Sequence, residues 1–149
     1  MKYLLAIDQS TSGTKALLFD EAAQLIARSA LPHQQKISEN GWVAHDPTEI
    51  WENTKSVVRM VVEKAGINKG DIVGLGISNQ RETALVWDRE TGLPVYDAIV
   101  WQCARGAKIC EGLSDHAEMI RERTGLRLSP YFSAAKIAWV LQNAPDLAG

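Results

Sequence analysis

Residues 3–19 read YLLAIDQSTSGTKALLF, with a polar stretch between two apolar runs. The first run, Tyr3–Ile7, predicts a buried strand, and the second, Ala16–Phe19, predicts its antiparallel partner. Residues 8–15, here called the opening turn, contain a carboxylate, four hydroxyl groups, a glycine and a lysine. A hairpin that only reversed direction would need a two-residue turn. This composition instead indicates a metal–phosphate site, with an acid for a hydrated cation, donors for phosphate oxygens and a glycine for close backbone approach.

The opening turn taken alone also fits a solvated hairpin, in which the Asp and Thr side chains bond to local backbone groups. The two interpretations are separated only by residues further along the chain. Six consecutive polar residues, 78–83, are of the wrong composition for a core, and they favour the functional interpretation.

The size and composition of the chain fit a globular protein. It has 149 residues, of which 46% are hydrophobic and 23% charged, so a disordered chain is excluded. The net charge of −2 gives no electrostatic basis for binding nucleic acid or an anionic membrane. No apolar stretch approaches a membrane span of about 20 residues, and the N-terminal apolar run is too short for a signal peptide. We therefore expect a cytoplasmic protein.

The two cysteines and three histidines do not indicate a metal centre. Cys103 and Cys110 lie seven residues apart, and the histidines are scattered along the chain. Neither spacing is typical of a zinc site, so both cysteines are expected to be packing residues.

One long helix is clearly predicted. Asp46 is the expected N-cap, Pro47 occupies the first helical position, and Gly66 follows the last periodic residue. The segment 31–44 before it is expected to be a loop or ragged edge. Further strands are predicted at 24–30, 71–78, 83–88 and 98–101, and further helices at 104–113, 115–123 and 133–143. The strand at 71–78 follows a helix and is apolar, so we expect it to be buried and parallel.

This order of elements predicts an α/β fold of the ribonuclease-H-like class, with a mixed sheet and helices. Three antiparallel strands are followed by a crossover helix into a parallel strand. A dinucleotide-binding fold would begin strand–helix–strand, with a glycine-rich turn leading into the helix. Here the opening turn leads into a strand, so neither that fingerprint nor a Walker A loop fits.

The polar residues 78–83 directly follow the predicted parallel strand. Ligands bind outside the carboxyl ends of strands in open sheets that contain parallel strands. Arg81 and Glu82 together suit a polyhydroxy compound, because a carboxylate accepts from adjacent hydroxyls while a guanidinium donates to them. The alternative is an exposed turn with an incidental charge pair.

Two aromatic residues are further candidates. Trp101 ends an apolar strand, so it is either a wall for the carbon side of a small polyol or a core tryptophan. Tyr131 precedes a predicted helix and either reaches a ligand or packs against that helix. The other tryptophans are expected to pack in the interior: Trp42, Trp51, Trp87 and Trp139.

Five motifs carry a family resemblance, in order and with compatible spacing: Asp8-Gln9-x-Thr11, Gly41-Trp42-Val43-x-His45-Asp46-Pro47, Asn79-Gln80-Arg81-Glu82-Thr83, Ile99-Val100-Trp101-Gln102 and Pro130-Tyr131-Phe132-Ser133. They closely resemble the N-terminal part of glycerol kinases, which belong to the FGGY family of carbohydrate kinases, with the actin-like ATPase fold. The resemblance runs through the whole chain. It implies phosphorylation of a terminal hydroxyl of glycerol or a related polyol, with ATP and Mg²⁺ as cofactors.

The resemblance also implies roles for individual residues. Asp8 would lie near the Mg²⁺–nucleotide phosphates and contact the metal through water. Phosphate-loop positions fall on Thr11, Ser12 and Gly13, and a basic position near the transferred phosphate falls on Lys15. Substrate hydroxyls would be held by Arg81, Glu82 and Tyr131, with Trp101 along the carbon chain; these four residues are here called the substrate cluster. Such residues position phosphates and neutralise charge, which is most of what phosphoryl transfer requires.

The chain departs from the glycerol kinase pattern at two positions. Ser10 stands where the family usually has glycine. Lys15 replaces an arginine, so a compact ammonium group stands in place of a guanidinium that can donate two parallel hydrogen bonds. The Ser12–Gly13 pair is more similar to the sugar-kinase branch of the family, whose members lack the Arg–Glu pair. A kinase of another sugar is therefore an alternative.

Members of this family are longer and consist of two domains that close on a cleft. The resemblance implies that residues 1–149 are the N-terminal part of the first domain. The catalytic base, the adenine pocket and the second domain would then lie outside this chain. We expect a fragment of a longer gene product that is inactive, or nearly so, by itself. The alternative is a stand-alone ligand-binding or interaction module without catalysis. Whether the parent protein is a homo-oligomer is left open.

Overall fold

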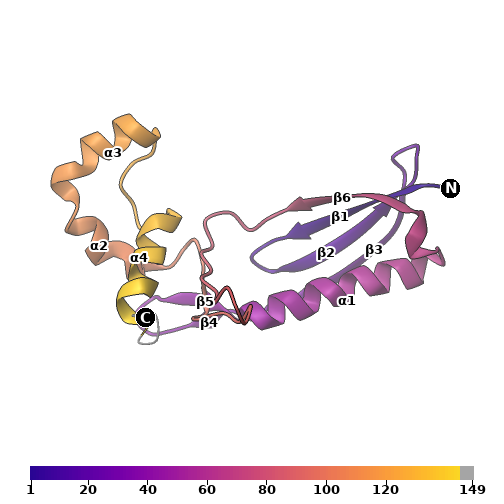
Figure 1. The fold of residues 1–149 in the computed structure, drawn as a ribbon, viewed down its shortest axis with the longest axis horizontal. Helices are drawn as coiled ribbons and strands as arrows, with labels where there is room; N and C mark the ends of the chain where they lie inside the picture. Colours follow the sequence, from indigo (N-terminus) through magenta and orange to yellow (C-terminus); the bar gives the residue numbers. More distant parts are fainter. Residues whose placement is uncertain (145–149) are drawn as a thin grey trace. The chain divides into compact units, whose positions relative to one another are not determined.

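The computed structural model describes residues 1–144 (Figure 1). Residues 145–149, which fall within the predicted domain portion, lie outside the described residues. The chain divides into two compact units, unit 1 with residues 1–34 and 48–80, and unit 2 with residues 35–47 and 81–149. That residues 1–149 form part of one domain stays a prediction.

Unit 1 contains a mixed four-stranded sheet. Its strands are β1 (Tyr3–Gln9), β2 (Gly13–Phe19), β3 (Leu25–Pro32) and β6 (Ile72–Ser78), in the order β3-β2-β1-β6. The first three strands pair antiparallel, and β6 pairs parallel to β1. The predicted meander, crossover and parallel strand are therefore confirmed, and with them the mixed α/β sheet.

The crossover is α1 (Pro47–Ala65), which has the predicted bounds. It ends before Gly66, whose φ of +64° is the left-handed conformation that favours glycine after a helix. The fully buried Val57 and Val61 pack against Leu5 and Leu18 of the sheet. Figure 1 shows α1 running alongside the strands of this unit.

The predicted burial of β6 is wrong. Its larger apolar side chains, Val73, Leu75 and Ile77, are exposed. The reason is that β6 is the last strand in the sheet order, while the core under α1 is built on β1, β2 and β3. Of β6, only Ile72 packs against that core.

Unit 2 contains a small sheet where the sequence predicted a loop at 31–44. It is formed by β4 (Lys36–Ile37), β5 (Val43–His45) and β7 (Ala98–Ile99). The strand predicted at 83–88 is wrong, because only the isolated bridges Ala84–Ile99 and Trp87–Pro94 hold this segment.

The helices of unit 2 are shorter than predicted in two cases. They are α2 (Ala107–Glu111), α3 (Ala117–Thr124) and α4 (Ser133–Asn143). Single 3₁₀ turns, η2 (Ala104–Gly106) and η3 (Ser114–His116), precede α2 and α3, and η1 (Lys69–Asp71) precedes β6 in unit 1. Gly125, at φ +74°, ends α3 as expected.

A second core lies in unit 2. The rings of Trp42 and Trp139 meet edge to face at 5.4 Å, and the Arg105 guanidinium lies 4.8 Å from each ring centroid. This arrangement stabilises a buried cation through the ring faces. The expected packing of Trp42 and Trp139 is thus confirmed. The same prediction is wrong for Trp51 and Trp87, which are 60% and 61% exposed.

Both cysteines are buried and unbridged, as expected for packing residues. Burial raises the pKa of the Cys110 thiol, so it is less reactive than an exposed cysteine. None of the helices formed by residues 1–144 is both long and apolar enough to cross a membrane. A cytoplasmic location stays a prediction.

Two glycines of the unit 1 sheet give opposite expectations for substitution by alanine. A Cβ at Gly13 would lie 2.4 Å from the Leu31 carbonyl oxygen, whereas a Cβ at Gly76 would meet no atom within 4 Å. We predict that Gly13→Ala lowers the free energy of unfolding by about 1–3 kcal/mol, because backbone must shift. Gly76→Ala, the matched control, should leave stability unchanged or slightly raised. Urea denaturation measures both, and equal midpoints would contradict the close approach at Gly13.

Candidate functional site

The opening turn is shorter in the structure than in the sequence pattern. The strands β1 and β2 extend to Gln9 and from Gly13, so only residues 10–12 lie outside them. Asp8 pairs in register with Lys15, and the Lys15 ammonium lies 2.8 Å from the Asp8 carboxylate. Leu5 packs under α1, and because strand side chains alternate, Asp8 projects from the opposite face of the sheet. Both charged groups are about half exposed.

Ser10 does not distort the turn. Its backbone N–H and its hydroxyl both donate to the Gly13 carbonyl, at 3.0 and 2.9 Å. Among the described residues, only Ala23 and Glu82 are non-glycine residues with positive φ. Ser10 therefore adopts a conformation that does not require the glycine usual in the family.

Hydrogen bonds made by buried and partly buried polar groups hold the opening turn in place. The His33 backbone N–H donates to the Ser12 carbonyl at 3.0 Å. Asn53 Nδ2 donates to the Pro32 carbonyl, which fixes the amide, and lies 3.2 Å from His33 Nδ1. On the other side of the ring, His33 Nε2 lies 2.8 Å from Thr14 Oγ1 and 2.9 Å from Gln9 Nε2. Sequence reasoning missed His33, because a single histidine in a polar segment gives no signal of burial.

Glu82 has the most constrained backbone of the predicted site residues. Its φ is +60°, a left-handed conformation that costs a non-glycine residue about 1–3 kcal/mol. Its Oε2 accepts hydrogen bonds from the Ser133 N–H at 3.0 Å and from the Ser133 hydroxyl at 2.9 Å. A carboxylate at the first turn of α4 is also favoured by the helix dipole. One carboxylate oxygen is thus occupied, and the group is held in one orientation.

The two aromatic residues of the substrate cluster lie together. The rings of Trp101 and Tyr131 meet edge to face at 6.0 Å, and they are 37% and 42% exposed. The alternative that Trp101 is a core tryptophan is therefore wrong. Tyr131 is also two residues from Ser133, so the aromatic pair and Glu82 are both tied to the start of α4.

Arg81 precedes Glu82 and is exposed. Within residues 1–144 its guanidinium takes part in no hydrogen bond or ion pair, so its donors are available to a ligand. The structure thus brings Glu82, Trp101 and Tyr131 together in unit 2, while the opening turn belongs to unit 1.

Sequence reasoning also missed Lys136, which lies one turn into α4. Its side chain is completely buried, and its Nζ donates to the backbone carbonyls of Tyr131 and Phe132. Burial lowers the pKa of this ammonium, and attraction to Glu82 partly opposes the effect. The helical pattern alone could not distinguish it from a solvent-facing lysine.

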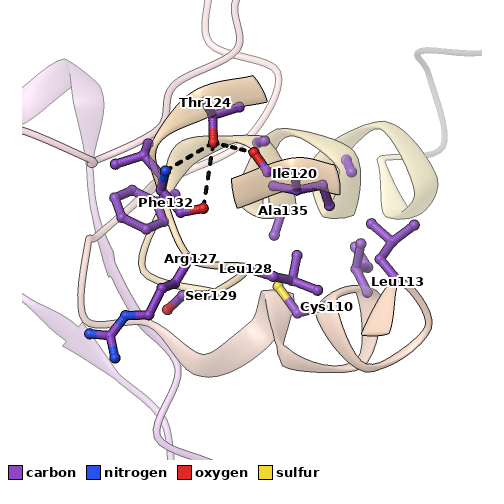
Figure 2. A pocket seen from close by; sticks show the side chains of 13 residues that line it. Cys110, Leu113, Ile120, Thr124, Arg127, Leu128, Ser129, Phe132 and Ala135 are labelled. Carbon is purple, nitrogen blue, oxygen red and sulfur yellow. Dashed lines mark hydrogen bonds between the residues drawn. The ribbon is translucent and has the colours of Figure 1, made fainter. Parts of the chain in front are cut away.

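Unit 2 also has an apolar pocket of about 390 Å³ (Figure 2). Its lining includes Cys110, Leu113, Ile120, Leu128 and Phe132, and none of the predicted site residues. Figure 2 shows the Thr124 hydroxyl bonded to the Ile120 carbonyl. The same hydroxyl accepts from the Leu126 N–H at 3.1 Å. The lining is unsuited to a polyol, because it offers few free polar groups to hydroxyls.

No group of three or more acidic, histidine or cysteine side chains gathers at metal-ligand spacing within residues 1–144. A protein-only metal cage is therefore absent from the described part. Asp8, a half-exposed single carboxylate, instead suits Mg²⁺, which keeps most of its water and is shared with substrate phosphates.

Curated proteins similar in sequence are glycerol kinases. The chain is 50% identical to glycerol kinase 1 of Thermotoga maritima over 143 residues, which covers 95% of this chain and 29% of that protein. It is 47% identical to glycerol kinase of Fusobacterium nucleatum over 146 residues, covering 96% and 29%. The chain thus spans less than a third of the length of these relatives.

Solved structures agree with this relationship. A glycerol kinase of Plasmodium falciparum with ADP superposes with a TM-score of 0.89 at 37% identity, covering 99% of this chain and 30% of that one. A xyloylose kinase from Brucella ovis superposes with a TM-score of 0.88 at 28% identity, covering 97% and 30%. The predicted fold of carbohydrate kinases is therefore confirmed.

The N-terminal domain of one protein family matches residues 3–149, which is nearly the whole chain. The predicted relationship is thereby confirmed, and the chain belongs to the FGGY family of carbohydrate kinases.

Proposed function

We propose that this chain is the N-terminal portion of a kinase that transfers the γ-phosphoryl group of ATP to a terminal hydroxyl of glycerol or a related polyol. The observation that carries the proposal is the Glu82 carboxylate, which Ser133 holds through one oxygen beside the exposed Trp101–Tyr131 pair. The second oxygen is available to accept from a substrate hydroxyl. An apolar face beside a fixed acceptor matches the carbon and oxygen sides of a small polyol.

The opening turn supports the nucleotide half of the proposal. Thr11, Ser12 and Gly13 would offer hydroxyl and backbone donors to phosphate oxygens, and Lys15 would neutralise their charge. Asp8 would hold Mg²⁺ through water, and the metal would reduce the repulsion between phosphates and incoming oxygen. The ion pair with Asp8 holds the Lys15 ammonium beside the opening turn, which supports this role.

In the proposed step, the substrate hydroxyl oxygen bonds to the γ-phosphorus as the bond to the ADP oxygen breaks. The hydroxyl proton passes to a base supplied from outside these 149 residues. Arg81 and Glu82 would fix the substrate, so that its reacting oxygen is held in line. By itself the chain would bind ligands weakly and turn them over slowly, because in this proposal the base comes from elsewhere.

Substitutions at Glu82 test the substrate half. In the full-length protein, Glu82→Gln should lower kcat/KM for glycerol roughly 10- to 100-fold, because a hydrogen bond to a charged group is worth about 1.5–3 kcal/mol. The KM for ATP should stay within about twofold of the wild-type value. Glu90→Gln, at an exposed turn position, is the matched control. Unchanged glycerol turnover in Glu82→Gln would refute the role of Glu82.

Backbone strain at Glu82 gives an independent expectation. Glu82→Ala and Glu82→Gly both remove the carboxylate, so both should lose glycerol phosphorylation. Glycine adopts positive φ freely, so Glu82→Gly should be more stable than Glu82→Ala by about 1 kcal/mol. Thermal or urea unfolding of the two variants measures this difference, and the reverse order would argue against a left-handed Glu82.

Substitution of Asp8 tests the nucleotide half. Asp8→Asn keeps the shape of the side chain and removes its charge, so kcat should fall about 100-fold or more. The Mg²⁺ concentration for half-maximal rate should rise at the same time. Asp71→Asn, at an exposed residue that ends η1, is the control and should behave as wild type. An Asp8→Asn enzyme with normal Mg²⁺ dependence would remove Asp8 from the metal site.

The competing assignment within the family is a kinase of another sugar, and rates with different substrates test it. Coupled measurement of ADP release with glycerol, xylulose and gluconate as substrates compares kcat/KM directly. The proposal expects glycerol or another small polyol to give the highest value. A preference for a ketose sugar would assign the chain to the other branch.

A further inference from the structure

Lys136 is a buried charge that the proposed function does not yet use. It lies in α4, three residues after Ser133, and is completely buried. Its Nζ donates to the Tyr131 carbonyl and, at 3.3 Å, to the Phe132 carbonyl. The same ammonium lies 5.9 Å from the centroid of the Tyr131 ring. One side chain therefore engages both the backbone and the ring of a predicted substrate residue.

A lysine is a costly way to fill this space. Removing an ammonium from water carries a penalty of several kcal/mol, which an apolar side chain of similar length would avoid. Burial accordingly lowers the pKa of Lys136, and the attraction of Glu82 opposes that effect. Cys103 and Cys110 are both buried thiols, and their charges when ionised would also favour the protonated lysine. Packing alone does not account for a charge at this position.

The contacts of Lys136 and Ser133 converge on the same short segment. Ser133 fixes the Glu82 carboxylate through two hydrogen bonds, and Lys136 fixes the two carbonyls that immediately precede Ser133. Phe132 is the N-cap of α4 in extended conformation, and its backbone N–H donates to the Ser129 carbonyl at 3.3 Å. The first turn of α4 thus holds Tyr131 and Glu82 at a fixed separation.

We propose that Lys136 is a positioning residue for the substrate cluster, which orients Tyr131 through its backbone carbonyl. The inference rests on the proposed function, because it concerns the same polyol site. Lys136 itself would not touch the substrate. Its loss would leave the Tyr131 and Phe132 carbonyls without their charged donor.

The test uses the full-length protein and three variants. Lys136→Met removes the charge and keeps the length of the side chain, and Lys136→Gln keeps hydrogen-bond donors without the charge. Lys108→Met, an exposed lysine in α2, is the matched control. Initial rates with glycerol and with ATP as the varied substrate give KM and kcat for each, and thermal unfolding gives stability.

We expect Lys136→Met to raise the KM for glycerol about tenfold or more, with the KM for ATP within about twofold of the wild-type value. Lys136→Gln should give an intermediate KM for glycerol, and Lys108→Met should match the wild type. A positioning role predicts this selective effect on one substrate. A purely structural role would lower the unfolding temperature and the active fraction but leave the KM for glycerol unchanged.

Two results would overturn the inference. One is a glycerol KM in Lys136→Met and Lys136→Gln equal to that of Lys108→Met. The other is a failure of both Lys136 variants to fold, which would make the role of Lys136 structural. The activity of the wild-type protein with polyols and sugars is measured before that of any variant. If the wild type phosphorylates none of them, the proposed function itself fails.

Discussion

The hydrogen bonds from Ser133 to the Glu82 carboxylate are the interaction on which the candidate substrate site depends. They join residues 51 positions apart in the chain and fix the orientation of an acceptor whose backbone is in a left-handed conformation. Two donors from one residue offset part of the strain at Glu82. Without this contact, the Glu82 carboxylate would have no fixed direction.

The opening turn, which belongs to the other unit, is also held in place by hydrogen bonds. Its charged groups, Asp8 and Lys15, are partly exposed, while the groups that hold the turn in place are buried. His33 bonds to Ser12 through its backbone and to Thr14 through its ring, and Gly13 leaves room for the Leu31 carbonyl. In each unit, exposed chemistry is supported by buried polar contacts. This division suits phosphoryl transfer, which depends on fixed positions more than on covalent participation by the protein.

The elements that the sequence predicted well are those with a strong local signal. The α1 helix carries a proline at its start, a glycine after its end and a periodic apolar face, and its bounds were predicted correctly. The segment 83–88 alternates like a strand but pairs only through isolated bridges, because ladder formation depends on distant partners. The burial of β6 was misjudged for a similar reason, since composition does not reveal which strand lies at the edge of a sheet.

The site residues show the same limit. Asp8, Glu82, Trp101 and Tyr131 were predicted from motifs, and this assignment stays a prediction. The neighbouring contacts come from His33, Ser133 and Lys136, which no local pattern singles out. The most direct measurement of the central claim is a crystal structure of the full-length protein with glycerol and ADP. The account predicts a glycerol hydroxyl about 2.5–3.0 Å from a Glu82 carboxylate oxygen, with Ser133 still bonded to the other. Glycerol bound without contact to Glu82 would contradict it.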